Sequence, residues 1–378
     1  MGGVSMEWKE DVLGNVLEVK YGKDHKKLAD GQYPVYGSGG LMRYVDSKLY
    51  DGPSILIPRK GTLNNIMFVE SPFWTVDTMF WSIINTDKVD PKFLFYSICK
   101  RDFASMNVGS AVPSMTVNIL NDIQISYPKN IEDQRRIASI LSSLDRKIEL
   151  NNKINADLEE MAQAIFKNWF VDFEPFKDGK FVDSELGMIP EGWEVGSPYE
   201  YVKVVYGAPY KSAKFNDNGE GLPLIRIRDL KDCNPQFYTP EILPQTEYVN
   251  MGDIVAGMDA EFVPHIWKGN TGLLNQRVCK LMPQQTSISN LFVLYLMKPE
   301  LEFVQSYKTG TTVSHLGKAD IDKFVVVLPP LKVVEECSKI LDSILQRIKN
   351  ISAESRNLSL LRDTLLPRLM SGELEVPE

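Results

Sequence analysis

Residues 137–169 read IASILSSLDRKIELNNKINADLEEMAQAIFKNW, and the spacing of the apolar side chains in this stretch decides the fold. Steps of four and three residues alternate along one stripe, which is the heptad pattern of a helix that packs along another helix. At ~1.5 Å per residue, about 35 residues form a helix roughly 50 Å long, which one small domain cannot cover. The stripe consists of Ile137, Leu141, Leu144, Ile148, Asn151, Asn155, Leu158, Ala162, Ile165 and Trp169.

A second stretch near the end of the chain repeats the pattern, and neither stretch contains Gly or Pro before Pro367. Since the first helix carries the chain away from its first domain, the second helix can bury its stripe against the first only by running back antiparallel. We therefore expect a two-helix rod, in which Asn151 and Asn155 face Ser355 near the middle of the seam and fix its register. The second stripe consists of Leu341, Ile344, Ile348, Ile351, Ser355, Leu358, Leu365 and Leu369.

The remainder of the chain is also duplicated, with a repeat too long for a solenoid and suited to a duplicated domain. Trp8 to Tyr21-Gly22 spans as many positions as Trp193 to Tyr206-Gly207. Further matches join residues 92–98 to 291–297 and residues 109–128 to 310–329.

Within each copy, short apolar strands alternate with Gly, Asn, Asp and Pro, which is typical of a mixed α+β domain. The strands include residues 54–57, 66–69 and 223–227, and one helix per copy is expected around 91–100 and 290–298. We predict an α+β fold with largely antiparallel sheets, in which two similar domains are related by an approximate two-fold axis. The predicted domains are residues 1–130 and 179–330, and the predicted helical segments with the intervening link are 131–178 and 331–378.

Composition places the chain among ordinary globular proteins, with 378 residues, 43% apolar and 24% charged. The four cysteines lie far apart without a C-x-x-C pair, so neither a zinc module nor a disulfide scaffold is indicated. No signal peptide and no run of about 18 apolar residues is present, and we expect a cytoplasmic protein without a membrane span. The net charge of −8 means that any nucleic acid must be bound through local basic clusters.

Enzymatic motifs are weak in this sequence. It has three histidines without H-x-x-x-H spacing, no P-loop, and a Tyr36–Gly40 segment that reads as a turn. Asn234–Phe237 is similar to the base-holding loop of amino-methyltransferases, but Gln236 replaces its second proline and we interpret it as an ordinary turn. We expect no catalytic residues, no metal site and no cofactor site in this chain.

Several segments together resemble the specificity subunits of Type I restriction–modification enzymes over nearly the whole chain. They are Gly187–Glu194, Phe166–Phe176, Gly221–Leu230 and Trp8–Gly14. The family's helix-opening pattern is matched at Pro128, Glu132, Gln134 and Ile137, although Asp133 is inserted. The second copy departs further, because Glu335-Glu336-Cys337 lacks the glutamine.

This resemblance implies that each domain reads half of a split site in double-stranded DNA. It also implies that two methyltransferase subunits clasp the helices and that ATP-driven restriction subunits join them. S-adenosylmethionine, ATP and Mg would then bind to those partners. Successive half-sites on one duplex face lie about 34–36 Å apart, so the helices would set the spacer between them.

Matched positions of the duplication nominate the residues that read DNA. Arg59-Lys60 follows an apolar strand, and the matched positions hold Met258-Asp259. Arg or Lys suits guanine O6 and N7, whereas Asp can accept from cytosine N4. Further candidates are Lys23, Lys26, Lys27, Ser38 and Thr78 in the first copy, and Lys211, Arg226, Arg228, Asn275, Gln276, Arg277 and His315 in the second.

Two details of the second copy stay open at this point. Arg226 and Arg228 are expected on one strand face, where Asp229 would pair with one of them, and Tyr210 is expected to pack.

The alternative function is a structural or adhesive coiled-coil protein whose end domains bind protein or glycan. A self-contained methyltransferase ranks third.

Overall fold

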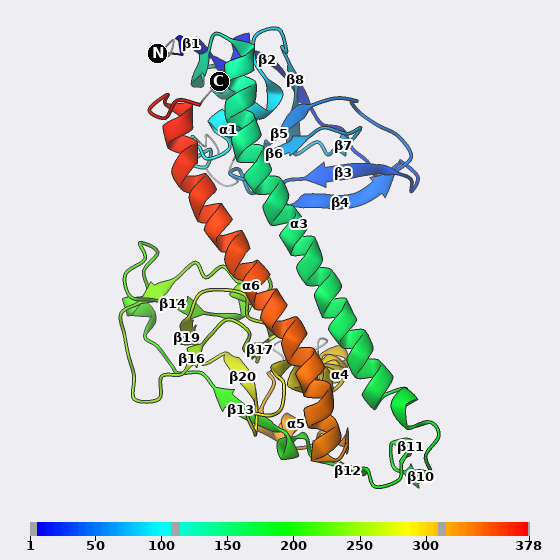
Figure 1. Cartoon of the computed structure of the whole chain (residues 1–378). Coiled ribbons are helices and arrows are strands. Elements are labelled where there is room, and N and C mark those ends of the chain that lie inside the picture. The colour runs from blue at the N-terminus through cyan, green and yellow to red at the C-terminus, as the bar shows by residue number, and fades with distance from the viewer. Residues whose placement is uncertain (1–5, 107–113, 309–314, 377–378) are drawn as a thin grey trace. The chain divides into compact units, whose positions relative to one another are not determined.

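The computed structural model describes residues 6–106, 114–308 and 315–376. The chain divides into two compact units (Figure 1). Unit 1 consists of Met1–Ile148 together with Asn357–Glu378, and unit 2 consists of Glu149–Arg356. Two 40-residue helices, α3 (Ile131–Phe170) and α6 (Leu331–Met370), each contribute one part to either unit.

Unit 1 is built on a four-stranded antiparallel sheet of order β2-β8-β5-β6, beside a three-stranded sheet of order β4-β3-β7 and the pair β1-β9. Every residue of β5 is buried, as expected for a central apolar strand. The elements are β1 (Trp8–Val12), β2 (Leu17–Tyr21), β3 (Tyr33–Gly37), β4 (Gly40–Val45), β5 (Ser54–Pro58), β6 (Met67–Val69), β7 (Trp74–Thr75), β8 (Met79–Ile84), α1 (Pro91–Ile98), α2 (Val117–Asn121) and β9 (Gln124–Pro128).

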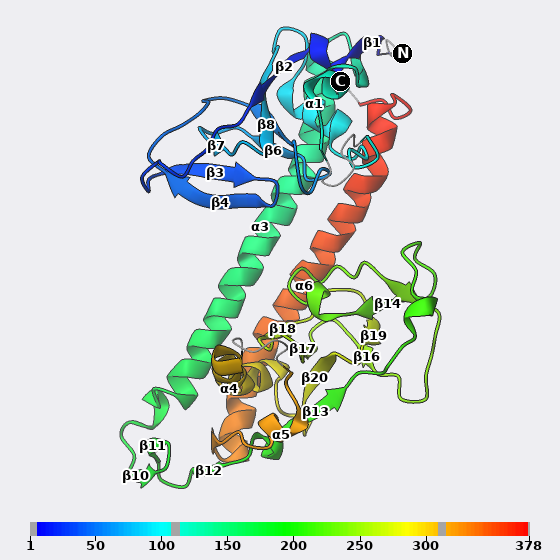
Figure 2. The same ribbon diagram turned by 180° about the vertical axis from the view of Figure 1, so that it is seen from behind.

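Unit 2 contains sheets of order β13-β20-β17-β18 and β15-β14-β19-β16, together with the pairs β12-β21 and β10-β11 (Figure 2). Its elements are β10 (Phe181–Ser184), β11 (Gly187–Pro190), β12 (Glu194–Gly196), β13 (Val202–Tyr206), β14 (Leu222–Ile225), β15 (Tyr238–Thr239), β16 (Tyr248–Val249), β17 (Ile254–Gly257), β18 (Pro264–Ile266), β19 (Gly272–Leu274), β20 (Val278–Pro283), α4 (Asn290–Lys308), α5 (Lys318–Ile321) and β21 (Val326–Leu328).

The same hydrogen bonds recur in both units, which confirms the duplication. Gly22 N–H donates to the Met79 carbonyl over 3.0 Å, and Gly207 N–H donates to the Val278 carbonyl over 3.2 Å. A Cβ on Gly22 would lie 2.0 Å from the Val76 carbonyl oxygen, so only glycine allows this approach. Residues 114–128 and 315–329 of the third match are described, whereas 109–113 and 310–314 lie outside the described residues.

The long helices pair antiparallel within each unit, as predicted. In unit 2, Asn151 Nδ2 donates to Glu354 Oε2 over 2.8 Å and Asn155 Nδ2 donates to Ser352 Oγ over 3.0 Å. The prediction placed Ser355 opposite both asparagines; that residue is also buried, but these two bonds go to its neighbours. In unit 1, Arg362 Nη1 donates to Asp145 Oδ1 over 2.6 Å.

The predicted seam residues are buried or half-buried, and most of the apolar ones belong to the core of the unit that holds them. Leu341, Ile344 and Ile348 pack with the sheet and α4 of unit 2. Ile137 and Leu141 pack with the core of unit 1. Residues of the stripe therefore pack against the other long helix and also against the core of each unit.

The predicted α+β class with two domains and an antiparallel helix pair is confirmed, and most strand pairs are antiparallel. Two pairs, β3-β7 and β14-β19, are parallel. The Tyr36–Gly40 turn joins β3 to β4, and Asn234–Phe237 lies in a loop, as interpreted from the sequence.

Two elements differ from the prediction. α4 continues to Lys308, past Pro299, although a helix ending near 298 was expected. Proline removes one intrahelical donor, but buried Leu301 and Val304 pack into the unit 2 core and outweigh that loss. The link after α3 contains a hairpin of β10 and β11 that the sequence analysis did not anticipate.

Candidate nucleic-acid interface

In unit 1, the ends of three strands meet at one edge of the main sheet. β2 ends at Tyr21, which pairs with Phe80, and β5 ends at Pro58, which pairs with Met79. The chain continues from β5 into the predicted reading residues. Arg59 N–H and Lys60 N–H both donate to the Thr78 carbonyl, over 2.8 and 3.2 Å. Three of the predicted residues, Arg59, Lys60 and Thr78, therefore lie together.

The Arg59 guanidinium lies over the Tyr21 ring, 5.6 Å from its centroid. Tyr21 is 55% exposed and packs edge-on against Phe80. A cation above an aromatic face is attracted by the ring quadrupole and gains a preferred direction. Arg59 is thus held at the edge by an aromatic contact.

Ser38 joins this group, because the Asn65 side-chain amide donates to its carbonyl over 2.8 Å and a Cβ on Gly61 would lie 2.8 Å from its Oγ. Lys23 N–H donates to the Thr75 carbonyl over 2.9 Å, which ties Lys23 to the same edge. Lys26 and Lys27 lie on the exposed turn that follows, where Asp24 accepts from Lys26 N–H. The last two lysines are not fixed against the Arg59 loop by any hydrogen bond or ion pair between described residues.

In unit 2, the corresponding region is a pocket of about 380 Å³. Five predicted residues line it, and they are Arg226, Arg228, Asn275, Gln276 and Arg277. Tyr210, Ser212, Phe215 and Ile227 complete the lining. Three guanidinium groups and two amides on one concave surface match the donors that contact phosphates and base edges.

The prediction that Arg226 and Arg228 share a strand face is wrong. β14 ends at Ile225, and Arg228 lies in a short 3₁₀ helix, Ile227–Asp229. Asp229 accepts the Arg226 backbone N–H over 3.0 Å, which ends the strand and starts that helix. Burial raises the pKa of the Asp229 carboxyl, against the lowering effect of this hydrogen bond.

The Arg226 guanidinium lies 4.8 Å from the Phe237 ring centroid. Its direction is therefore set by an aromatic face, as for Arg59 in unit 1. Arg226 and Arg228 still line the same pocket, although the local backbone that brings them there is a turn and not a strand.

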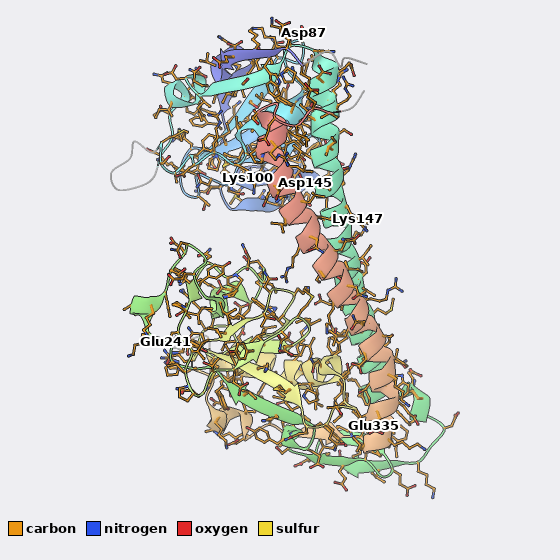
Figure 3. The ribbon with its side chains drawn as sticks, turned by 60° about the vertical axis from the view of Figure 1, so that its left-hand side comes forward. Asp87, Lys100, Asp145, Lys147, Glu241 and Glu335 are labelled. Carbon is orange, nitrogen blue, oxygen red and sulfur yellow. The ribbon has the colours of Figure 1, made fainter. Side chains whose placement is uncertain are left out.

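Glu241, labelled in Figure 3, holds the loop that carries Lys211 through a hydrogen bond to the loop backbone. Its Oε2 accepts the Lys211 backbone N–H over 2.9 Å, and its Oε1 pairs with Lys214 Nζ at 3.0 Å. These contacts, the backbone bond first, hold the pKa of Glu241 below its usual range. The Lys211 side chain is exposed beside the pocket lining. Tyr210 is buried and donates to Thr246 Oγ1 over 3.0 Å, so it packs as expected.

Asp259 follows the end of β17, and its side chain contacts His315. His315 Nδ1 lies within hydrogen-bond distance of Asp259 Oδ1, and Arg277 Nε lies 3.3 Å from Asp259 Oδ2. The two backbones also form an isolated bridge, as Lys60 and Ser114 do in unit 1. Every predicted residue of unit 2 thus lies in the pocket, beside it, or in this ion-paired cluster.

Three aromatic residues of this interface were missed from the sequence. Tyr21 and Phe237 lie beneath arginines, and Phe215 lines the pocket and contacts Phe237 at 6.4 Å between ring centroids. An available signal was the matched pair Tyr21-Gly22 and Tyr206-Gly207, which marks an aromatic residue at a sheet edge. Phe237 had no such signal, because its contact with Arg226 depends on the fold.

In the described part of the chain, no helix combines the length and the hydropathy that a membrane span requires. No group of three or more His, Cys, Asp or Glu side chains in the described part of the chain is arranged to hold a metal ion.

A duplicated α+β domain that presents arginines, lysines and amides at matched strand ends has the side chains that proteins use to contact phosphates and base edges. Comparison with known proteins gives the family. The family model for the Type I restriction modification DNA specificity domain matches residues 6–160 and again 190–358. The chain belongs to this family and is a Type I specificity subunit with two target-recognition domains.

Its relatives include specificity subunits that are matched over most of their length. The MjaIX specificity subunit of Methanocaldococcus jannaschii is 27% identical over 93% of this chain and 86% of the relative. The HindI specificity subunit of Haemophilus influenzae is 24% identical over 82% of this chain and 83% of the relative. A crystal structure of the S subunit of a Type I restriction–modification system from M. genitalium shares the fold, with a TM-score of 0.57 and 16% identity over 97% of both chains.

Proposed function

We propose that this chain is a non-catalytic subunit that supplies sequence choice to a DNA methyltransferase. Each unit reads one half of a bipartite target in double-stranded DNA. The family supports the DNA-recognition role, and this proposal extends it to the division of labour between the two units.

The observation that carries the proposal is the contrast between conserved backbone and changed side chains in the duplication. The bond from Arg59 N–H to the Thr78 carbonyl recurs as a bond from Met258 N–H to the Arg277 carbonyl. The side chains at these positions differ in size and charge, while the backbone holds them at the same place. Two readers of different sequences need this combination, because position must be fixed while the donors and acceptors change.

The helices have two roles in this proposal. Outward-facing apolar side chains such as Leu150, Leu360 and Leu361 are 52%, 70% and 46% exposed in the isolated chain. We assign them to contacts with two methyltransferase subunits, because those contacts would remove these apolar side chains from water. The paired helices would also set the number of base pairs between the half-sites.

The chemistry belongs to the partners in this account. S-adenosylmethionine binds to the methyltransferase subunits, and ATP and Mg bind to restriction subunits that join the complex. The chain itself acts in the cytoplasm, where the DNA and those partners are found.

The test is DNA binding by the chain in complex with its methyltransferase subunits, measured over a series of salt concentrations. We expect a duplex with a split recognition sequence to bind with an affinity that falls as salt rises, because phosphate contacts release counterions. A duplex with one half-site scrambled should bind more weakly, and one with the spacer changed should do the same.

The controls separate this proposal from its rivals. An adhesive protein would give no salt-dependent shift of any duplex, and a self-contained methyltransferase would bind S-adenosylmethionine as an isolated chain. Equal affinity for split and scrambled duplexes would contradict the proposal.

A further inference from the structure

The ion-paired cluster after β17 determines what Asp259 can do. Its Oδ2 pairs with Arg277 Nε at 3.3 Å, and its Oδ1 is hydrogen-bonded to His315 Nδ1. The Asp259 side chain is 23% exposed, whereas Arg277 is 55% and His315 52% exposed. The carboxylate therefore lies beneath two longer side chains that project further toward solvent.

The matched positions in unit 1 show what has changed between the copies. Arg59 N–H donates to the Thr78 carbonyl in unit 1, and Met258 N–H donates to the Arg277 carbonyl in unit 2. Arg59 therefore corresponds to Met258, and Thr78 corresponds to Arg277. Lys60 corresponds to Asp259, since each forms the matching backbone bridge, to Ser114 and His315 respectively. Each unit thus carries one arginine at this pair of adjacent strand ends. In unit 1 it is Arg59, which follows β5, and in unit 2 it is Arg277, which precedes β20.

The support beneath the arginine changes with its position. In unit 1, the Tyr21 ring lies 5.6 Å from the Arg59 guanidinium. In unit 2, the Asp259 carboxylate contacts the Arg277 guanidinium through Oδ2 and His315 through Oδ1. The carboxylate at the position that matches Lys60 is thus engaged by Arg277 and His315.

We propose that Arg277 is the guanine-reading residue of unit 2 and that Asp259 positions it, without reading cytosine itself. An ion pair through Nε leaves the terminal Nη groups for bidentate bonds to guanine O6 and N7. Holding the guanidinium in one direction lowers the entropy lost when those bonds form. This inference rests on the proposed function of the unit and adds the base and the residue that reads it.

The test uses the full chain in complex with its methyltransferase subunits and a library of duplexes with both half-sites randomised. We expect Arg277→Ala to lower the preference for guanine at one position of the unit 2 half-site by roughly 5- to 150-fold. Arg277→Lys should lose most of that preference and keep more of the affinity, because an ammonium cannot form the planar fork.

Variants of Asp259 test the positioning role. Asp259→Ala should weaken the preference at the same position as Arg277→Ala, by a smaller factor. Asp259→Asn, which keeps an acceptor, should restore part of it. The double variant Asp259→Ala/Arg277→Ala should lose no more than Arg277→Ala alone, because Asp259 acts through the arginine.

The unit 1 half-site is the internal control, since an unchanged preference there shows that the complex is folded and bound. Relaxation at a separate cytosine position in Asp259→Ala would overturn the inference, as would an unchanged preference in Arg277→Ala. If the unaltered complex selects no split sequence, the proposed function fails first, so the two failures are distinguishable.

Discussion

At the scale of single residues, Arg59 and the lysines of unit 1 differ in how firmly they are held. Arg59 lies over the Tyr21 ring and its backbone is bonded to Thr78. Lys26 lies on an exposed turn, where its backbone alone is bonded to Asp24. An ordered side chain can discriminate between bases, whereas a solvated one contributes charge.

We predict that Arg59→Ala relaxes base preference at one position of the unit 1 half-site by roughly 5- to 150-fold. The matched control is Lys26→Ala, which should lower affinity for all sequences alike and reduce the salt slope by about one unit. Selection from a randomised library, repeated at several salt concentrations, measures both effects. A uniform loss in Arg59→Ala would assign that residue to phosphate.

The residues of the interface could be predicted from sequence in part. Comparison of the two copies nominated Arg59, Lys60 and Asp259, because a duplication reveals which positions vary on a common backbone. The ion pair of Asp259 with Arg277 joins residues 18 positions apart in the chain. They lie just beyond the paired ends of β17 and β20, a pairing that the sequence alone did not predict. The interpretation of Asp259 as a cytosine acceptor stays a prediction, and the Asp259 variants proposed above test it against a role in positioning Arg277.

At the scale of elements, the heptad stripes were the strongest signal in the sequence, because a long amphipathic pattern has few competing explanations. They located both helices and their buried faces. The continuation of α4 beyond Pro299 was not predictable in this way, since it depends on the burial of Leu301 and Val304 by other parts of unit 2.

We predict that Leu341→Ala lowers the free energy of unfolding by about 2–5 kcal/mol, because this fully buried side chain fills the core where α6 meets unit 2. Leu360→Ala on the same helix is the control, because its side chain is 70% exposed, and it should change stability by less than about 0.5 kcal/mol. Denaturant unfolding of the isolated chain measures both. A similar loss in the two variants would mean that Leu341 is not part of a packed core.

At the scale of the whole molecule, the division of α3 and α6 between two units makes their length a quantity that can be engineered. Each has 40 residues, or about 60 Å at 1.5 Å per residue. Under the proposed function this length is matched to the spacer of the target.

We predict that four residues added to each helix, between Ile148 and Glu149 and between Arg356 and Asn357, lengthen the accepted spacer by about two base pairs. The reason is that one extra turn adds ~6 Å, close to two base-pair steps of ~3.4 Å. Mapping of methylated positions in a host that carries the variant complex measures the spacer. An unchanged spacer with both half-sites intact would contradict the role of the helices as a ruler.

Unit 1 is completed by Asn357–Glu378, and Leu366 and Leu369 from that segment are buried in the same core as Ile137 and Leu141. Residues 1–148 are synthesised before Glu149–Arg356, and Asn357–Glu378 only after it, so the core of unit 1 is completed after all of unit 2 has been synthesised. If translation stopped before Asn357, unit 1 would lack the two leucines that complete its core, whereas every residue of unit 2 would already have been made.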